Sequence, residues 1–283
     1  WILFEKNIGE KLSIDEVAVT NGELYTIVTN KAGRGGKGSL VTIVEGVKTK
    51  TTIEVLAKIP MEQRLAVKEV TLDMSNAMDA IIRASFPKAD IVTDRFHAQQ
   101  LISEALQEIR GSLRRTVLKE ETEAILAAKK KKEIYQPTTY ENGDTKKQLL
   151  TRSFHLLFKS SSKWTEKQKQ RATILFREFG ELDEAYKLSM MFRSWYEHNT
   201  NKDQAQQNLQ SWYEKVEEKN IASFIVAARS IQAHEDTILN YFNHRSTNAS
   251  AESFNAKLKG FRGLVRGVRD VKFFLFRVGR LCG

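Results

Sequence analysis

The feature that most constrains the fold is a change of pattern along the chain. Between residues 11 and 110, short β-branched and aromatic runs alternate with amphipathic stretches, which predicts strands and helices that share one sheet. From about residue 111 to 235 these runs vanish, and Lys, Glu, Gln, Leu and Ala dominate, which predicts helices alone. We therefore expect an α/β fold in three parts: residues 1–110 form the first part of a core, 111–235 an all-helical insertion, and 236–283 the last part of the core.

The first part reads as three strands followed by alternating helices and strands. Glycine-containing turns separate the first three runs, which indicates an antiparallel meander. A helix that Ser75 or Asn76 can cap follows the fourth strand, and a long amphipathic helix starts near Ala98. This order predicts a mixed sheet with helices packed on it. The expected strands cover residues 12–15, 24–28, 40–44, 67–72 and 91–93.

Charge and cysteine content narrow the class of protein. The formal net charge of +10 favours a polyanionic partner, and from Lys257 to the end eight basic residues face one acidic residue. Cys282 is the only cysteine, which excludes a disulfide framework and a cysteine-based zinc site and fits a reducing compartment. No run is apolar enough to span a membrane. The start has no basic leader and no initiator Met, so we expect an excerpt from a longer protein without a signal peptide.

Two carboxylates occupy places where sites form in α/β sheets. Asp15 ends the first predicted strand, and Asp73 follows the strand over residues 67–72. If these strands are neighbours, the two like charges meet and need a cation, for which hard oxygen ligands select Mg²⁺ or Mn²⁺. A third acid, Glu252, shares one face of a late helix with Asn248 and Asn255, although a solvated polar face is the alternative interpretation.

Four short motifs in order resemble a known family. They are Ile14-Asp15-Glu16, Leu72-Asp73-Met74-Ser75, the run from Val92 to His97, and His244-Arg245-Ser246-Thr247-Asn248 followed by Glu252, Asn255 and Lys257. Together they resemble the DDE transposases of bacterial insertion sequences, specifically the insertion-sequence L-three family. The resemblance implies an RNase H-like fold, a mixed sheet flanked by helices, which a helical insertion interrupts before the glutamate-bearing helix.

The resemblance also implies the chemistry. Asp15, Asp73 and Glu252 become a triad that holds two Mg²⁺ (or Mn²⁺) ions, which activate a water or a DNA 3′-hydroxyl for displacement at phosphorus. Side chains that could support this site are Asp94, His97, Asn248 and Asn255. Two alternatives stay open: a metal-dependent nuclease of the same fold, and a non-catalytic DNA-binding protein derived from a transposase.

The expected partner is double-stranded DNA, both mobile-element ends and target. Basic residues after the glutamate, on a glycine-bearing segment, suit phosphate contact, although a generic basic tail would look the same. These residues are Lys257, Lys259, Arg262, Arg266 and Arg269. Trp195 is a candidate for stacking on an unpaired base, against the more usual role of a core residue. By analogy with the family, we expect a homodimer in a synaptic complex, without membrane contact, in the bacterial cytoplasm at the nucleoid.

Two departures from the family pattern matter. Ser253 stands where relatives usually have Gly, which is harmless on a helix. Relatives also carry an upstream zinc-binding and helix-turn-helix region, and nothing before Ile14 resembles it. Recognition of specific DNA ends is therefore not assigned to this chain.

Overall fold

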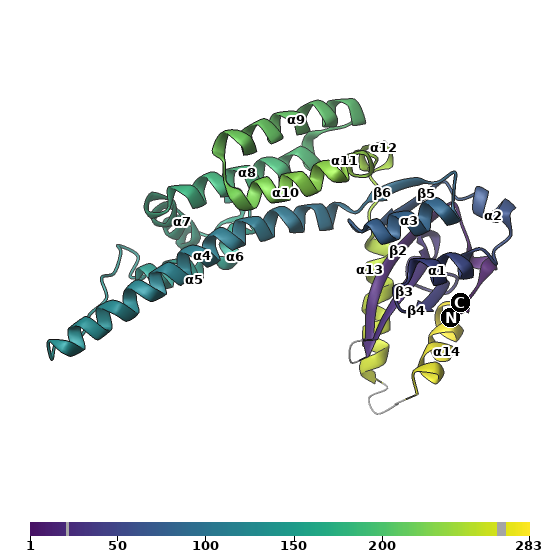
Figure 1. The fold of residues 1–283 in the computed structure, drawn as a ribbon, viewed down its shortest axis with the longest axis horizontal. Coiled ribbons are helices and arrows are strands. Elements are labelled where there is room, and N and C mark those ends of the chain that lie inside the picture. Colours follow the sequence, from purple (N-terminus) through teal and green to yellow (C-terminus); the bar gives the residue numbers. More distant parts are fainter. Residues whose placement is uncertain (21–22, 265–269) are drawn as a thin grey trace. The chain divides into compact units, whose positions relative to one another are not determined.

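The computed structural model describes residues 1–20, 23–264 and 270–283 and divides into two compact units (Figure 1). Unit 1 comprises residues 1–98 and 234–283, and unit 2 comprises residues 99–233. The first boundary lies early in α4 (Arg95–Lys130), upstream of residue 110, where the sequence pattern was expected to change.

Unit 1 is built on a six-stranded mixed sheet. Its strands are β1 (Ile2–Leu3), β2 (Lys11–Thr20), β3 (Glu23–Asn30), β4 (Leu40–Glu45), β5 (Glu69–Leu72) and β6 (Asp90–Thr93). They lie in the order β1-β4-β3-β2-β5-β6. The β2–β3, β3–β4 and β1–β4 pairs are antiparallel, whereas β5 pairs in parallel with β2 and with β6. The predicted mixed α/β fold is confirmed, and it agrees with an RNase H-like core.

The predicted end of the first strand at Asp15 is wrong. β2 runs on to Thr20, because its antiparallel pairing with β3 continues as far as Thr20 opposite Glu23. Its parallel pairing with β5 stops much earlier, at Ser13 opposite Thr71. Asp15 therefore lies inside a strand but beyond the part that β5 covers, at the carboxyl end of β5.

Helices cover both faces of the sheet (Figure 1). The helices of unit 1 are η1 (Glu5–Asn7), η2 (Lys31–Gly33), α1 (Thr49–Leu56), α2 (Met61–Leu65), α3 (Asn76–Ser85), α11 (Glu235–Leu239), α12 (Tyr241–His244), α13 (Ala249–Leu264) and α14 (Val271–Cys282). Residues of α1 and α3 join one buried apolar cluster with Leu12 and Ile14. Residues of α13 and α14 join a second with Val17 and Ile27. Because strand side chains alternate between faces, β2 contributes to both clusters.

Unit 2 has no strand among its described residues apart from one isolated bridge. Its helices are the remainder of α4, α5 (Lys146–Arg152), α6 (Phe154–Leu157), η3 (Ser161–Lys163), α7 (Glu166–Glu178), α8 (Gly180–His198), α9 (Lys202–Lys219) and α10 (Ala222–Ala233). This all-helical character follows from the loss of β-branched alternation after residue 110.

The tryptophans of unit 2 each donate the indole N–H to a backbone carbonyl oxygen: Trp164 to Leu156, Trp195 to Ala205 and Trp212 to Leu188. Trp195 is only 5% exposed, and its ring stacks on Phe192. In this arrangement Trp195 contributes to the core of unit 2. Base stacking by Trp195 stays a prediction.

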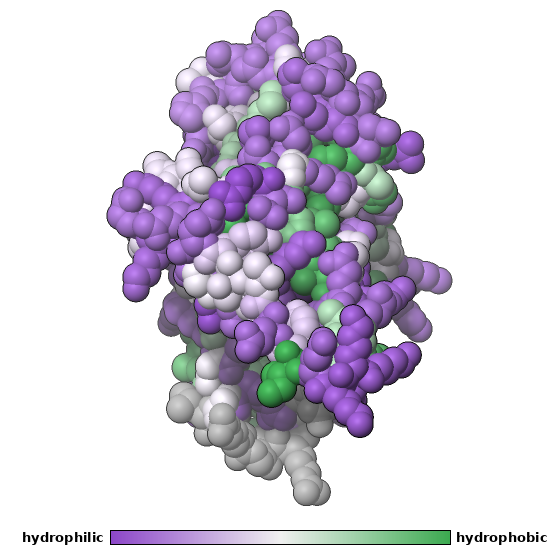
Figure 2. Space-filling model, turned by 90° about the vertical axis from the view of Figure 1, so that its left-hand side faces the viewer, coloured by the Kyte–Doolittle hydropathy of each residue, from purple (hydrophilic) through white to green (hydrophobic). Residues whose placement is uncertain are grey.

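The surface on one side of the molecule is mainly polar (Figure 2). The face in Figure 2 is covered mainly by hydrophilic side chains, and apolar groups appear there in small separate areas. No helix in the described part of the chain combines the length and the apolar character needed to cross a membrane.

The second apolar cluster sets how firmly α13 is held, which can be tested at one residue. Phe254 is 1% exposed in that cluster, so we expect Phe254→Ala to lower the free energy of unfolding of unit 1 by about 3–5 kcal/mol. Phe276→Ala is the matched control, because Phe276 on the neighbouring α14 is 59% exposed and its loss should cost less than about 0.5 kcal/mol. Chemical denaturation measures both, and equal losses would contradict this packing.

Candidate active site

Sheet register brings the predicted aspartates together. Ser13 of β2 lies opposite Thr71 of β5 in the last pair of this parallel ladder, and Asp15 and Asp73 each follow two positions later, Asp73 just past the end of β5. The negative charge of Asp15 raises the pKa of Asp73, which agrees with two carboxylates that lie close together. The register of β5 with β6 continues the row, and Asp94 follows β6 as Asp73 follows β5. We call Asp15, Asp73 and Asp94 the acidic row.

Asp15 is half-buried and held by two hydrogen bonds. Its Oδ1 accepts from the backbone N–H of Glu16 at 2.8 Å, and its Oδ2 accepts from the side-chain amide of Asn255 at 2.6 Å. Burial nevertheless raises the pKa of Asp15, against the opposing effects of these bonds and of His97 and Lys259. Asn255, predicted to support the site, thus contacts a predicted metal ligand directly. Glu16 itself is exposed.

Asp73 has less support from its surroundings. Its Oδ1 is buried and has no hydrogen-bond partner among the described residues. Burial raises the pKa of Asp73, and the negative charge of Asp15 raises it further, while His97 and His234 act in the opposite direction. A buried carboxylate oxygen without a donor, beside a second carboxylate, is a place where a cation would be favourable.

Asp94 forms a hydrogen bond that connects the end of β6 with the segment before α13. It is almost fully buried, and its Oδ1 accepts from the backbone N–H of Asn248 at 3.3 Å. It also accepts from the N–H of Phe96 in the first turn of α4. Burial raises the pKa of Asp94, and its Oδ2 has no hydrogen-bond partner in the described part of the chain.

His97 interacts with every carboxylate of the acidic row. It lies in the first turn of α4, half-buried, and it interacts electrostatically with Asp15, Asp73 and Asp94, lowering the pKa of each. This common effect places the imidazole near all three carboxylates.

Glu252 is not gathered with the aspartates. It lies in the first turn of α13, and its side chain is exposed. Among the described residues, no three His, Cys, Asp or Glu side chains come close enough to hold a metal ion together. Residues three apart on a helix share a face, so Glu252 lies on the same side of α13 as Asn255, whose amide reaches Asp15. The helix therefore presents this face to the acidic row.

The residues predicted to contact DNA fall in two groups. Lys257, Lys259 and Arg262 lie on α13. Arg266 and Arg269 lie outside the described residues.

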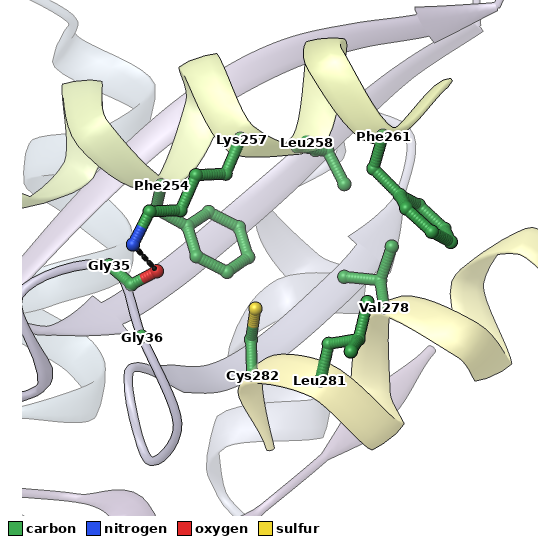
Figure 3. Close-up of a pocket in the computed structure, with 9 residues that line it drawn as sticks. All are labelled: Gly35, Gly36, Phe254, Lys257, Leu258, Phe261, Val278, Leu281 and Cys282. Atoms are coloured by element: carbon green, nitrogen blue, oxygen red, sulfur yellow. Dashed lines mark hydrogen bonds between the residues drawn. The ribbon is translucent and has the colours of Figure 1, made fainter. Parts of the chain in front are cut away.

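Both lysines of α13 interact with other residues of unit 1. The ammonium of Lys257 donates to the carbonyl oxygen of Gly35 at 2.9 Å, and both residues line a cavity of about 240 Å³ (Figure 3). Lys259 is exposed and lowers the pKa of Asp15 electrostatically. The positive charge on this helix thus extends to the edge of the acidic row.

A buried ion pair next to the acidic row was not predicted from the sequence. The ammonium of Lys31 donates to Glu69 at 3.0 Å and to the hydroxyl of Thr71. Burial lowers the pKa of Lys31; burial alone would raise the pKa of Glu69, but hydrogen bonds from Ser246 and Lys31 lower it overall. Glu69 and Thr71 alternate along one face of β5, and a charged residue inside this short buried strand was the available signal.

His234 is a second residue that the motifs did not indicate. It is half-buried in unit 1 and interacts electrostatically with Asp73. Nothing in its local sequence pattern distinguishes it, because its approach to Asp73 depends on the return of the chain after residue 233.

Comparisons with known proteins identify a family. The family model of ISL3-type DDE transposases, described as "Transposase", matches residues 12–278. The chain is 24% identical over 271 residues to the transposase for insertion sequence element IS1001 of Bordetella parapertussis. That alignment covers 95% of this chain and 60% of the relative, so the chain spans about three-fifths of that protein's length. No solved structure gives a significant match.

The family match extends from the start of β2 to α14 and so includes every element that carries the acidic row and the glutamate helix. The chain belongs to the ISL3 family of DDE transposases.

Proposed function

We propose that this chain is the catalytic core of a transposase that cleaves DNA strands at the ends of a mobile element and joins the freed 3′ ends to a target. Family membership supports the class of reaction. The observation that carries the proposal is the pair Asp15 and Asp73, two carboxylates just beyond the paired part of two adjacent parallel strands, both with a pKa raised by burial. Such a pair favours a bound divalent cation.

The proposed metal ligands are Asp15, Asp73 and Glu252, with two Mg²⁺ or Mn²⁺ ions. The fit rests on the donor set, because carboxylate oxygens are hard ligands and the buried Oδ1 of Asp73 has no hydrogen-bond partner among the described residues. Glu252 is exposed, one helical turn before Asn255, so a change of side-chain rotamer is the smallest movement that would bring it toward Asp15. Bound divalent ions would supply Lewis-acid polarisation of a phosphodiester and lower the pKa of a nucleophilic water or hydroxyl.

The remaining residues near the site have supporting roles in this proposal. Asn255 orients the Asp15 carboxylate through its amide, and Asn248 connects Asp94 to the start of α13. His97 reduces the repulsion within the acidic row by its electrostatic effect on all three carboxylates. This arrangement orients carboxylates before substrate arrives, which is the protein's main task when catalysis depends on positioning.

Double-stranded DNA is the proposed partner. Lys257, Lys259 and Arg262 would contact its phosphates beside the acidic row, and Arg266 and Arg269 would extend this contact. Pairing of two element ends leads us to propose a homodimer in a synaptic complex, acting on the nucleoid in the bacterial cytoplasm. The chain spans 60% of that relative's length, and recognition of specific ends is not part of this proposal.

A strand-transfer assay tests the reaction. The full-length transposase, with Mn²⁺ and a labelled element-end duplex, should yield both cleaved strands and joined product. Asp73→Asn should reduce both to background, because the variant keeps the shape of the side chain but loses its negative charge. Asp79→Asn is the control, since Asp79 lies on α3 in a surface ion pair with Arg83 and is not part of the acidic row, and it should act like the wild type.

The outcomes separate the alternatives. Cleavage without joined product would support a nuclease. DNA binding without either product, with no effect of Asp73→Asn, would support a non-catalytic DNA-binding protein and contradict the proposal.

Metal-free stability should depend on pH through the acidic row. Since burial raises the pKa of Asp15 and of Asp73 above 3.8, these groups hold their protons to higher pH in the folded chain than in the unfolded chain. The stability that they contribute is present below the unfolded pKa and is lost as pH rises through the folded values. Asp73→Asn should therefore lose less stability than the wild type between about pH 4 and about pH 7 without metal.

The same variant should lose the stabilisation by metal. At about 100 times the dissociation constant, Mn²⁺ should stabilise the wild type by about 2.7 kcal/mol, and it should leave Asp73→Asn nearly unchanged. Thermal denaturation with and without Mn²⁺ measures both effects. An equal gain in wild type and variant would mean that the ion binds elsewhere.

A further inference from the structure

The loop between β3 and β4 is in close contact with α13. Gly35 has φ of +73°, a conformation that glycine adopts without strain, and a Cβ there would lie 3.0 Å from the backbone N of Phe254. The carbonyl oxygen of Gly35 accepts from Lys257 one turn further along the helix (Figure 3). The hydroxyl of Ser250 donates to the carbonyl oxygen of Lys31 at 3.4 Å. The loop thus contacts α13 at three successive turns.

The Lys31–Glu69 pair fixes the start of this loop to the sheet. The side chain of Lys31 is 13% exposed and that of Glu69 is 2% exposed. Lys11 adds a second, more exposed ion pair to Glu69 at 3.4 Å. Both partners are largely removed from water, so loss of Glu69 alone would leave the Lys31 ammonium without its carboxylate, and loss of Lys31 alone would leave Glu69 paired only with the more exposed Lys11.

The same carboxylate reaches the segment that leads into α13. Ser246 donates to Glu69, and two residues later the N–H of Asn248 donates to Asp94. Glu69 therefore connects the β3–β4 loop, through Lys31, with the segment that precedes Glu252.

Stability alone does not account for a charged pair at this position. A buried ion pair is on average no more stabilising than apolar residues of similar volume, because desolvation of the charges offsets their attraction. The pair instead makes directional hydrogen bonds. The Glu69 carboxylate accepts from Lys31 in the β3–β4 loop and from Ser246 before α13, two segments that are far apart in sequence. An apolar pair at residues 31 and 69 would fill the space but hold neither segment at a fixed height above the sheet.

We propose that the Lys31–Glu69 pair is a positioning device that sets the first turn of α13, and with it Glu252, relative to Asp15 and Asp73. This inference rests on the proposed function of these three acids. Lys31 and Glu69 do not contact the reacting atoms in this proposal; they act through the position of the helix. Their loss should lower the rate of the chemical step more than the affinity for DNA.

The test uses a variant that keeps the fold. In Lys31→Met/Glu69→Leu of the full-length transposase, apolar side chains replace both charges, so the free energy of unfolding should change little. Amide hydrogen exchange should become at least tenfold faster in residues 249–264, while exchange in β3 and β4 stays as in the wild type. Ser246→Ala, which removes only the bond to the approaching segment, should accelerate exchange in the same helix. Arg83→Met, which breaks a surface ion pair on α3, is the control and should change neither region.

Kinetics supply the second measurement. A misplaced catalytic group can cost about 10²-fold in rate, so kcat for strand cleavage in the double variant should fall on that order, with the dissociation constant for the element-end duplex unchanged. Unchanged exchange in residues 249–264, or equal acceleration across all of unit 1, would overturn the positioning role. Faster exchange in α13 with wild-type kcat would overturn it as well.

Failure of the proposed function would look different. In that case the wild type itself would show no metal-dependent cleavage. The exchange measurements would still report whether Lys31 and Glu69 hold the helix.

Discussion

Burial of neighbouring carboxylates is the constraint on which the candidate site of unit 1 depends. Asp15 and Asp73 come together because β2 and β5 pair in parallel just before them, and burial removes much of the water that would solvate their charges. The surrounding residues reduce this cost only in part: the backbone N–H of Glu16 and the side-chain amide of Asn255 donate to Asp15, and His97 lowers the pKa of all three carboxylates of the acidic row. A site that buries carboxylates with incomplete compensation favours a bound cation, and this preference links the fold to the proposed chemistry.

Periodicity predicted the layered core well. The runs around residues 12–15, 24–28, 40–44 and 91–93 all lie in strands, and the loss of alternation after residue 110 marks a region of helices. The end of β2 was misplaced because the expected strand stopped where its apolar run stopped. Antiparallel hydrogen bonding to β3 carries the strand on to Thr20, and that depends on a partner segment rather than on local preference.

Sequence motifs indicated part of the candidate site. The position of Asp73 after a buried strand and of Asn255 on the glutamate helix follow from spacing, and both lie beside Asp15. Spacing cannot give a rotamer, so it left open whether Glu252 faces the aspartates or solvent, and in the structure its side chain is exposed. It also missed Lys31, because the burial of a lysine depends on a carboxylate 38 residues away. Charged residues buried by long-range pairing carry no periodic signal.

The alternation of side chains along β2 joins the site and the core in one structural requirement. Ile14 belongs to the apolar cluster on one face, and Asp15 points to the opposite face. Sliding this strand by a single residue would bury the carboxylate among aliphatic side chains and turn the isoleucine toward the glutamate helix. A pairing of β2 that is shifted by one residue is therefore destabilised by two costs, a buried charge and a lost apolar contact. The register that buries Ile14 in the core is the same register that places Asp15 beside Asp73. Packing of the hydrophobic core therefore also selects the correct geometry of the site.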